Sequence, residues 1–247
     1  MRLLLSYDGS DFHGWQKQPE GQQTVQGVLE SALSQILDEP IAVCGGGRTD
    51  KGVHALNQNA HFWTTKNPLN YNFTYALNGN ITPYSLHIKK AWLAPDDFHA
   101  LSSTHKTYQY VVLNRETPSP IKRNYSLHVK RPLNIDLLNE AAQCLIGEHD
   151  FTSFQTSGTE SLTTIKKILQ SQWRKTDKDT VIYTITGNGF LRQMVRNIVG
   201  TLLHIENKGL SASEIPRILA AKDRQKAYES AAPQGLYLTQ VNYPKAL

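Results

Sequence analysis

The chain has 247 residues, of which 39% are hydrophobic and 19% are charged, and its formal net charge is +5. No apolar run reaches the roughly 18 residues that a membrane-spanning helix needs, and the two cysteines, Cys44 and Cys144, are too few for a disulfide framework and lack the Cys-x-x-Cys spacing of zinc sites. We therefore expect a globular protein of a reducing cytoplasm, with one large domain or two smaller ones.

The positive charge is divided among several short clusters. A basic chain fits a polyanionic partner such as nucleic acid, although solvated surface lysines and arginines explain such clusters equally well. Scattered clusters favour a broad groove for a folded RNA over one compact anion pocket. The clusters are Arg48 with Lys51, Lys89–Lys90, Lys122–Arg123, Lys130–Arg131, Lys166–Lys167, and Lys222 with Arg224 and Lys226.

The N-terminal part of the chain predicts a strand, a helix and two further strands. Met1–Gly9 has the pattern of a buried strand, and a loop rich in polar and aromatic residues follows it. Thr24 is a suitable N-cap, and apolar residues recur at helical spacing over Val25–Leu37, which predicts a helix packed on the core. Ile41–Val43 and Gln58–Phe62 then predict strands on either side of a glycine-rich loop.

That loop, Gly45–Ala55, holds the candidate catalytic group. Three consecutive glycines allow positive φ and the close approach of another chain segment. Asp50 stands between Arg48 and Lys51, and these cations favour its ionised form, which suits a nucleophile or a charge stabiliser. The pattern also suits a plain turn in which Asp50 only bridges the two cations, because carboxylates in structural ion pairs are common.

The middle of the chain predicts a second helix and two strands. The helix is expected at Leu69–Leu77 with Asn78–Asn80 as its stop, and a strand at Tyr84–Ala94. Thr107–Leu113 is rich in aromatic and β-branched residues, which predicts the next strand. Two tyrosines of this strand share a face, for which the core is the default interpretation. The basic, turn-rich Pro118–Asn124 is the best internal boundary by composition.

The rest of the chain repeats the order of helices and strands. Arg192 and Arg196 stand four residues apart in an expected helix, and therefore share one of its faces. The order of the elements, with few strand–helix–strand crossovers, predicts an α+β fold of antiparallel sheets with helices on one side. The expected elements are a helix at Asp136–Leu145, strands at Thr164–Trp173 and Thr180–Thr186, a helix opened by Gly189–Gly200, and a strand at Leu236–Tyr243.

Several motifs of the chain form a recognisable set. The most specific is Gly47–Ala55 continued by Gln58, Ala60, His61 and Phe62, and the others are Tyr7–Gly9, Gly14–Gln16, Phe98–Ala100, Lys106–Tyr108, Gly147–Phe154 and Met194–Gly200. Together they resemble the motifs of the TruA family of tRNA pseudouridine synthases, and the resemblance extends from Tyr7 to Tyr243. The sequence departs from the family pattern at Leu101–Ser102, which stand where the family has Arg-Phe, so no role for an arginine carries over there.

The resemblance implies a fold, an activity and partners. The fold would have two plait-like subdomains, residues 1–105 and 106–247, whose antiparallel sheets form a continuous sheet with helices on one side and a basic cleft between the subdomains. The activity would convert uridine to pseudouridine in the anticodon stem-loop of tRNA, and the enzyme would be a cytoplasmic homodimer. No metal and no small-molecule cofactor are expected, because the isomerisation includes no redox step and no group transfer.

The resemblance also implies roles for four residues. Asp50 would be the catalytic residue, and Arg196 would pair with its carboxylate and hold it ionised. Tyr108 would stack on the uracil of a uridine flipped out of its stack. Arg48 would contact a phosphate or occupy the space of the flipped base. Asp50 could attack C1′, add to C6 of the base or deprotonate C2′, and the sequence leaves these three routes open.

Other functions compete with this interpretation. A hydrolase that cuts the same glycosidic bond usually needs a second carboxylate, for which Asp8 and Asp11 are weak candidates. A non-catalytic RNA-binding module would use Asp50 only as a structural bridge. A metal site at His54 and His61 is a weaker alternative, because lone histidines on a strand rarely bind metal.

Overall fold

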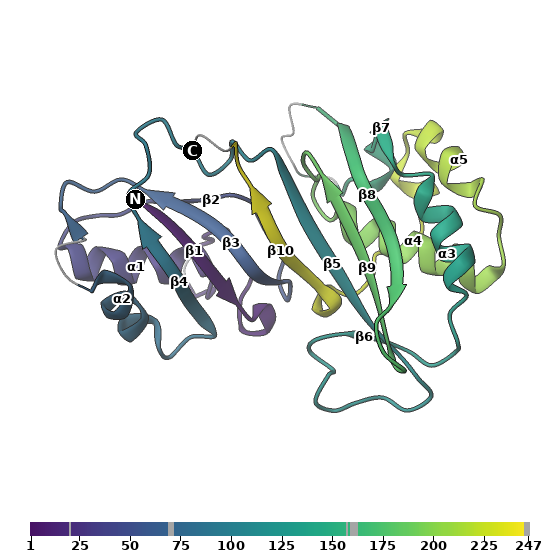
Figure 1. Ribbon diagram of the computed structural model, residues 1–247, viewed down its shortest axis with the longest axis horizontal. Coiled ribbons are helices and arrows are strands. Elements are labelled where there is room, and N and C mark those ends of the chain that lie inside the picture. The colour runs from purple at the N-terminus through teal and green to yellow at the C-terminus, as the bar shows by residue number, and fades with distance from the viewer. Residues whose placement is uncertain (20, 69–71, 157, 159–162, 245–247) are drawn as a thin grey trace. The chain divides into compact units, whose positions relative to one another are not determined.

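The computed structural model describes residues 1–19, 21–68, 72–156, 158 and 163–244 (Figure 1). The chain forms two compact units. One consists of Met1–Thr104 together with the segment from Tyr237 onward, and the other of His105–Leu236. The subdomains expected from the resemblance place all of 106–247 in the second one. The C-terminal segment nevertheless belongs to the first unit, because its strand pairs in parallel with the strand that follows the Asp50 loop.

The sheet of the first unit is made of β1 (Arg2–Tyr7), β2 (Val43–Gly45), β3 (His54–Phe62), β4 (Leu86–Trp92) and β10 (Leu236–Asn242). β1 lies between β4 and β3 and is antiparallel to both, while β2 is antiparallel and β10 is parallel to β3. Side chains of β1 alternate, so that Leu3, Leu5 and Tyr7 face the core. β3 begins at His54, earlier than the sequence predicts.

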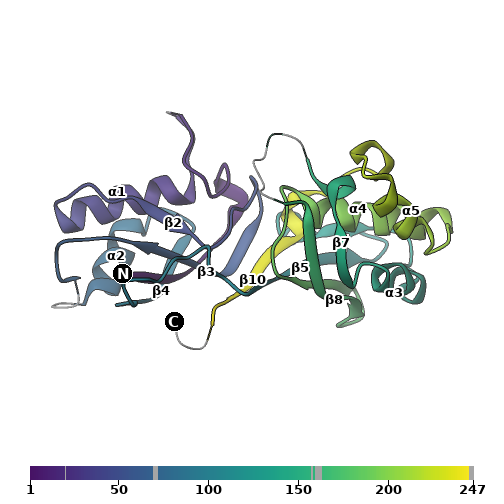
Figure 2. The ribbon, with the colours of Figure 1, turned by 90° about the horizontal axis from the view of Figure 1, so that it is seen from above.

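The helices of this unit are α1 (Val25–Leu37) and α2 (Phe73–Ile81), and Figure 2 shows both on the same side of the strands. Thr24 caps α1 by accepting the Gly27 N–H at 3.2 Å, as predicted. The expected stop of α2 at residues 78–80 is wrong. The helix continues to Ile81 because that residue, four after Leu77, is fully buried. Residues 69–71 of the expected helix lie outside the described residues.

The sheet of the second unit is made of β5 (His105–Asn114), β6 (Leu127–Val129), β7 (Gly147–Asp150), β8 (Ile165–Lys175) and β9 (Thr180–Gly187). β5, β9, β8 and β7 are antiparallel neighbours in that order, and β6 is parallel to β5. The strands predicted in this unit are confirmed. The proposed boundary at Pro118–Asn124 lies inside the unit, in the connection between β5 and β6.

The helices of the second unit are α3 (Ile135–Gln143), α4 (Met194–Lys208) and α5 (Glu214–Ala221), of which α5 was not predicted. Asn139 attaches α3 to β8, because its side chain bonds both the N–H and the C=O of Trp173, at 2.8 and 3.0 Å. α4 begins only at Met194, since Gln193 before it has a left-handed backbone with φ of 58°. Arg192 is therefore not on the helix, and the expected helical pair of Arg192 with Arg196 is wrong.

The α+β class with mostly antiparallel strands and helices on one side of each sheet is confirmed. The described residues also include short 3-10 turns, at Gly9–Asp11 (η1), Thr152–Phe154 (η3), Arg224–Lys226 (η4) and Pro233–Gly235 (η5). Within the described ranges, every helix is too short or too polar to cross a bilayer.

Candidate active site

Asp50 lies in the loop between β2 and β3, and the residue before it anchors this loop. The Thr49 carbonyl accepts the Trp15 N–H at 3.0 Å, and the Thr49 hydroxyl bonds the Tyr7 hydroxyl at 2.8 Å. The Asp50 carbonyl accepts the Val53 N–H at 3.1 Å, which closes a turn through Gly52 at a φ of 79°. Main-chain bonds on both sides of Asp50 therefore fix where its half-buried side chain begins.

The glycines before Asp50 are held by β3. The Gln58 side chain donates to the Gly47 carbonyl at 2.7 Å, and the Gly46 N–H donates to the Asn59 carbonyl at 2.7 Å. Gln58 is fully buried, and each such bond contributes about 0.5–1.5 kcal/mol net. The loop is thus fixed by neutral hydrogen bonds at both of its ends.

Two of the nearby glycines are required by close packing. A Cβ at Gly45 would lie 2.4 Å from the ring of Trp15, and Trp15 itself is buried. A Cβ at Gly14, where φ is 92°, would lie 2.7 Å from the Thr49 carbonyl oxygen. The glycines of the motif therefore allow the segment around Trp15 to pack directly against the Asp50 loop.

The two cations beside Asp50 differ in their surroundings. Arg48 is exposed. The Lys51 ammonium lies 3.2 Å from Nε2 of His13 and donates to it.

Tyr7, which bonds the Thr49 hydroxyl, is neutral at physiological pH. Burial raises the pKa of Tyr7 to about 12, so its hydroxyl stays protonated and available to Thr49 at neutral pH.

Tyr108 lies in β5 of the second unit and is only 7% exposed. Phe190, in the connection from β9 to α4, meets its ring edge to face at a centroid distance of 5.1 Å. Tyr110, on the same face of the strand, is fully buried and donates its hydroxyl to the Ala232 carbonyl at 2.7 Å. Burial raises the pKa of Tyr110, and the buried hydrogen bond to Ala232 gives this tyrosine a structural role.

Arg196 stands in the first turn of α4 and is half-buried. Its Nε donates to the Ala231 carbonyl at 2.8 Å, while the Ala231 N–H donates to the Arg196 carbonyl at 3.0 Å. This double contact fixes the guanidinium beside the turn that also accepts the Tyr110 hydroxyl.

The carboxylates considered for a hydrolase have structural partners. Asp8 accepts the Ser10 N–H at 2.9 Å as the cap of η1 and lies 3.1 Å from Nδ1 of His54. Asp11 accepts the Ser85 hydroxyl at 2.8 Å. His54 is buried, and its ring stacks on Tyr237 at 4.6 Å. These contacts explain the three residues as parts of the framework around the loop.

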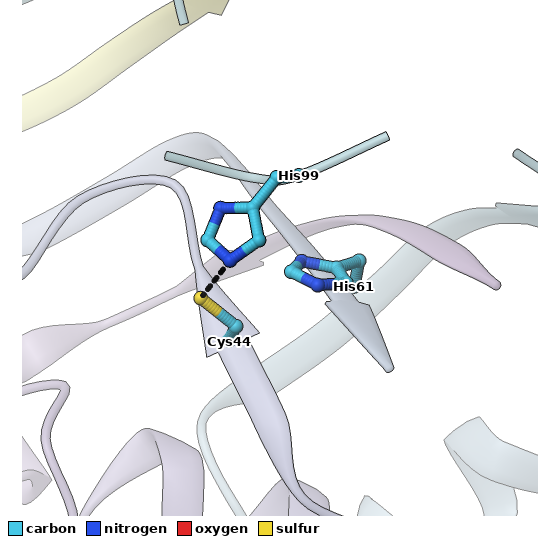
Figure 3. A group of neighbouring side chains, drawn as sticks. All are labelled: Cys44, His61 and His99. Carbon is cyan, nitrogen blue, oxygen red and sulfur yellow. Dashed lines mark hydrogen bonds between the residues drawn. The ribbon is translucent and has the colours of Figure 1, made fainter. Parts of the chain in front are cut away.

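Cys44, His61 and His99 form a group whose possible ligand atoms lie within 4.8 Å of one another (Figure 3). Both histidines accept a backbone N–H through Nδ1, from Ala100 at 3.1 Å and from Leu101 at 3.2 Å. A metal-bound histidine instead donates its second ring N–H to an acceptor. Burial also raises the pKa of Cys44, which opposes a thiolate ligand. The hydrogen bonds therefore do not fit a metal site here.

Sequence reasoning missed one basic residue near Tyr108. Lys106 lies two residues before Tyr108 on the same strand face and is half-buried. The two-residue spacing of Lys106 and Tyr108 in a predicted strand already indicates that they share a face.

Comparisons with known proteins identify relatives over the whole chain. A family model described as tRNA pseudouridine synthase matches residues 4–101 and 141–244. A tRNA pseudouridine synthase A of Bdellovibrio bacteriovorus is 47% identical over 252 residues, which cover 100% of this chain and 96% of the relative. Proteins of the same name from Ruminiclostridium cellulolyticum and Limosilactobacillus reuteri are each 42% identical over 98% of this chain, and the matches cover 99% and 96% of those relatives.

The fold and these matches define a pseudouridine synthase of the class that acts on tRNA. Within that class, the chain belongs to the TruA family. Members of the family are isomerases that convert uridine to pseudouridine in tRNA, and the predicted family and enzyme class are confirmed.

Proposed function

We propose that this enzyme isomerises uridines in the anticodon stem-loop of tRNA and that Asp50 is its catalytic residue. The observation that carries the proposal is the support of the Asp50 loop, in which Thr49 bonds both Trp15 and Tyr7 and Gly47 bonds Gln58. A group fixed in this way needs little reorganisation when the substrate arrives, and preorganisation of that kind accelerates the chemical step.

Two residues are proposed to contact the substrate, and a third to orient the catalytic carboxylate. Tyr108 stacks on the uracil after the nucleotide has left its stack, and the edge-to-face contact with Phe190 supports the ring in its orientation. Arg48, which is exposed, contacts the RNA backbone. Arg196, anchored on Ala231, holds the reactive carboxylate ionised and oriented, as the resemblance implies.

The wider proposal follows the family. The enzyme acts in the cytoplasm as a homodimer, receives the tRNA in a basic cleft, and needs no cofactor. The net charge of +5 supports a polyanionic substrate. The three chemical routes of Asp50, at C1′, C6 or C2′, all remain compatible with the proposal.

Two tRNA transcripts test the proposal. One is the natural sequence, and the matched control carries cytidine in place of each uridine of the anticodon stem-loop. We expect C5-linked uridine in the first transcript and none in the second, by nucleoside analysis of nuclease fragments. Equal product in both transcripts would contradict the stem-loop target. Release of free uracil would indicate a hydrolase, and unchanged RNA a binding protein, and either result would overturn the proposal.

A further inference from the structure

Lys106 and Lys166 lie on the same face of the second unit's sheet. Lys106 of β5 pairs with Gly187 of β9, and Gly187 pairs in turn with Ile168 of β8. Lys166 precedes Ile168 by two residues, so its side chain leaves the sheet on the same face. This is also the face of Tyr108, two residues along β5 from Lys106. The register therefore gathers both lysines at the Tyr108 end of the sheet.

Two glycines allow close packing beside these lysines. A Cβ at Gly187, the residue directly opposite Lys106, would lie 2.9 Å from Cδ1 of Ile168 and 3.2 Å from the Phe190 ring. The Lys166 side chain runs beside Gly189, where a Cβ would lie 3.6 Å from its Cδ. Both lysines are half-buried, and the loop that carries Gly189 also carries Phe190, the ring in contact with Tyr108.

Within the described residues, neither lysine has a carboxylate partner or a hydrogen-bond acceptor. His149, opposite Lys166 on β7, uses Nε2 to donate to the Ile146 carbonyl at 3.0 Å. Asp150, the next residue of β7, accepts from Thr152 and pairs with Lys222 at 3.1 Å. The Asp150 carboxylate therefore interacts with Thr152 and Lys222 and with neither lysine of the pair.

Two ammonium groups that lack an acceptor among the described residues are costly in this environment. Burial lowers the pKa of both amines, and the charge of Lys166 lowers the pKa of Lys106 further. A half-buried cation without a counterion reduces stability, and a bound anion would relieve that cost for both lysines at once. A lysine ammonium is a compact charge that binds phosphate well.

We propose that Lys106 and Lys166 together bind a backbone phosphate of the tRNA beside the uridine that meets Tyr108. The inference rests on the proposed role of Tyr108, and it makes the two lysines positioning residues. Phosphate contacts set the register of a nucleic acid without reading its sequence. A flipped nucleotide is extruded about its backbone, so a fixed phosphate next to it determines where the base arrives.

The test compares three variants in the full chain. Lys106→Met keeps the length of the side chain and removes its charge, and Lys106→Arg restores a cation. Lys175→Met, at the exposed far end of β8, is the matched control for the loss of one positive charge. For each variant we would measure tRNA affinity across a salt series, kcat and KM, and the thermal midpoint.

We expect Lys106→Met to weaken tRNA binding about tenfold, to raise KM more than it lowers kcat, and to reduce the slope of log affinity against log salt by about 0.7–0.9. Its thermal midpoint should equal or exceed that of the wild type, because an unpaired cation is gone. Lys106→Arg should recover most of the affinity.

A salt slope equal to that of the wild type or of Lys175→Met would overturn the inference. So would a lower midpoint with activity that only follows the folded fraction. A wild-type enzyme that modifies no anticodon stem-loop uridine would instead refute the proposed function, and the salt slope would still report whether the two lysines bind phosphate.

Discussion

Two regions carry the residues proposed for the chemistry, and they are supported differently. In the first unit, the loop at Asp50 is fixed by neutral hydrogen bonds to Trp15, Tyr7 and Gln58 and by close packing against glycines. In the second unit, Lys106 and Tyr108 project from a regular strand, where the ladder between β5 and β9 sets their positions.

This difference predicts which property a substitution should change in each region. An irregular loop depends on its neighbours, so a change in a supporting group displaces the carboxylate and affects the rate. A residue on a regular strand keeps its place when its side chain is changed, so such a change affects substrate binding and leaves the fold intact. The predictions below separate these two responses.

Among substitutions outside the proposed catalytic residue, the largest effect should come from Gly14→Ala. The substitution forces φ of 92° on an alanine and brings its Cβ within 2.7 Å of the Thr49 carbonyl. We expect a loss of about 2–4 kcal/mol in the free energy of unfolding from strain and overpacking, together with a fall in kcat. Denaturant unfolding and turnover of the folded fraction measure both effects.

Gly79→Ala is the matched control, because a Cβ there meets nothing within 4 Å on helix α2. It should stabilise the protein by about 0.5–1 kcal/mol and leave turnover unchanged. If Gly14→Ala unfolded like the wild type and kept its kcat, the close packing would not position the loop.

The second largest effect is expected for Tyr108→Ala. Loss of base stacking should reduce binding of the substrate by roughly 1–3 kcal/mol, whereas Tyr108→Phe should keep most of it. A rate assay beside a thermal melt checks this. A melt several degrees lower for the alanine variant, with turnover that follows the folded fraction, would show that Tyr108 is only part of the core.

A smaller effect, the pH dependence of stability, should distinguish a carboxylate of the second unit from the neutral contacts of the Asp50 loop in the first. Hydrogen bonds from Thr152, followed by other neighbours that include Lys222, lower the pKa of Asp150. Because the folded pKa lies below the unfolded value of about 3.9, Asp150 contributes stability above that value and loses it as the pH falls. The destabilisation caused by Asp150→Asn should therefore shrink between about pH 7 and about pH 3.

Tyr7→Phe is the contrasting variant. The folded pKa of Tyr7, about 12, is raised above its ordinary value, so its contribution is complete below about pH 10 and is lost only as the pH rises further. Its destabilisation should stay constant over the acid range in urea unfolding. If the destabilisation caused by Tyr7→Phe also shrank in acid, the claim that neutral hydrogen bonds support the Asp50 loop would be contradicted.

The smallest effect is expected from metal removal. Because His61 and His99 accept backbone N–H groups, EDTA should leave turnover undiminished. A loss of activity in EDTA that zinc restores would show that the group at Cys44 binds a metal needed by the enzyme.

Much of the fold follows from local patterns. The helical spacing of apolar residues in Val25–Leu37 predicts helix α1, and the alternation in β9 predicts a strand. In both, the apolar residues recur at the spacing that puts them on one buried face. The end of α2 and the start of α4 were missed, since burial of Ile81 and the left-handed backbone at Gln193 depend on tertiary packing. The pairing of Lys106 with Gly187 could not be predicted either, because it depends on strand register.

The central claim is that Asp50 performs the chemistry. The most direct test is Asp50→Asn, assayed for both tRNA binding and pseudouridine formation, with Asp11→Asn as a control that should retain turnover. Asparagine has nearly the same shape but cannot serve as a nucleophile or base. We predict near-total loss of product with binding kept within about tenfold, or about 1.4 kcal/mol. Pseudouridine formation by folded Asp50→Asn protein at close to the wild-type rate would contradict the account.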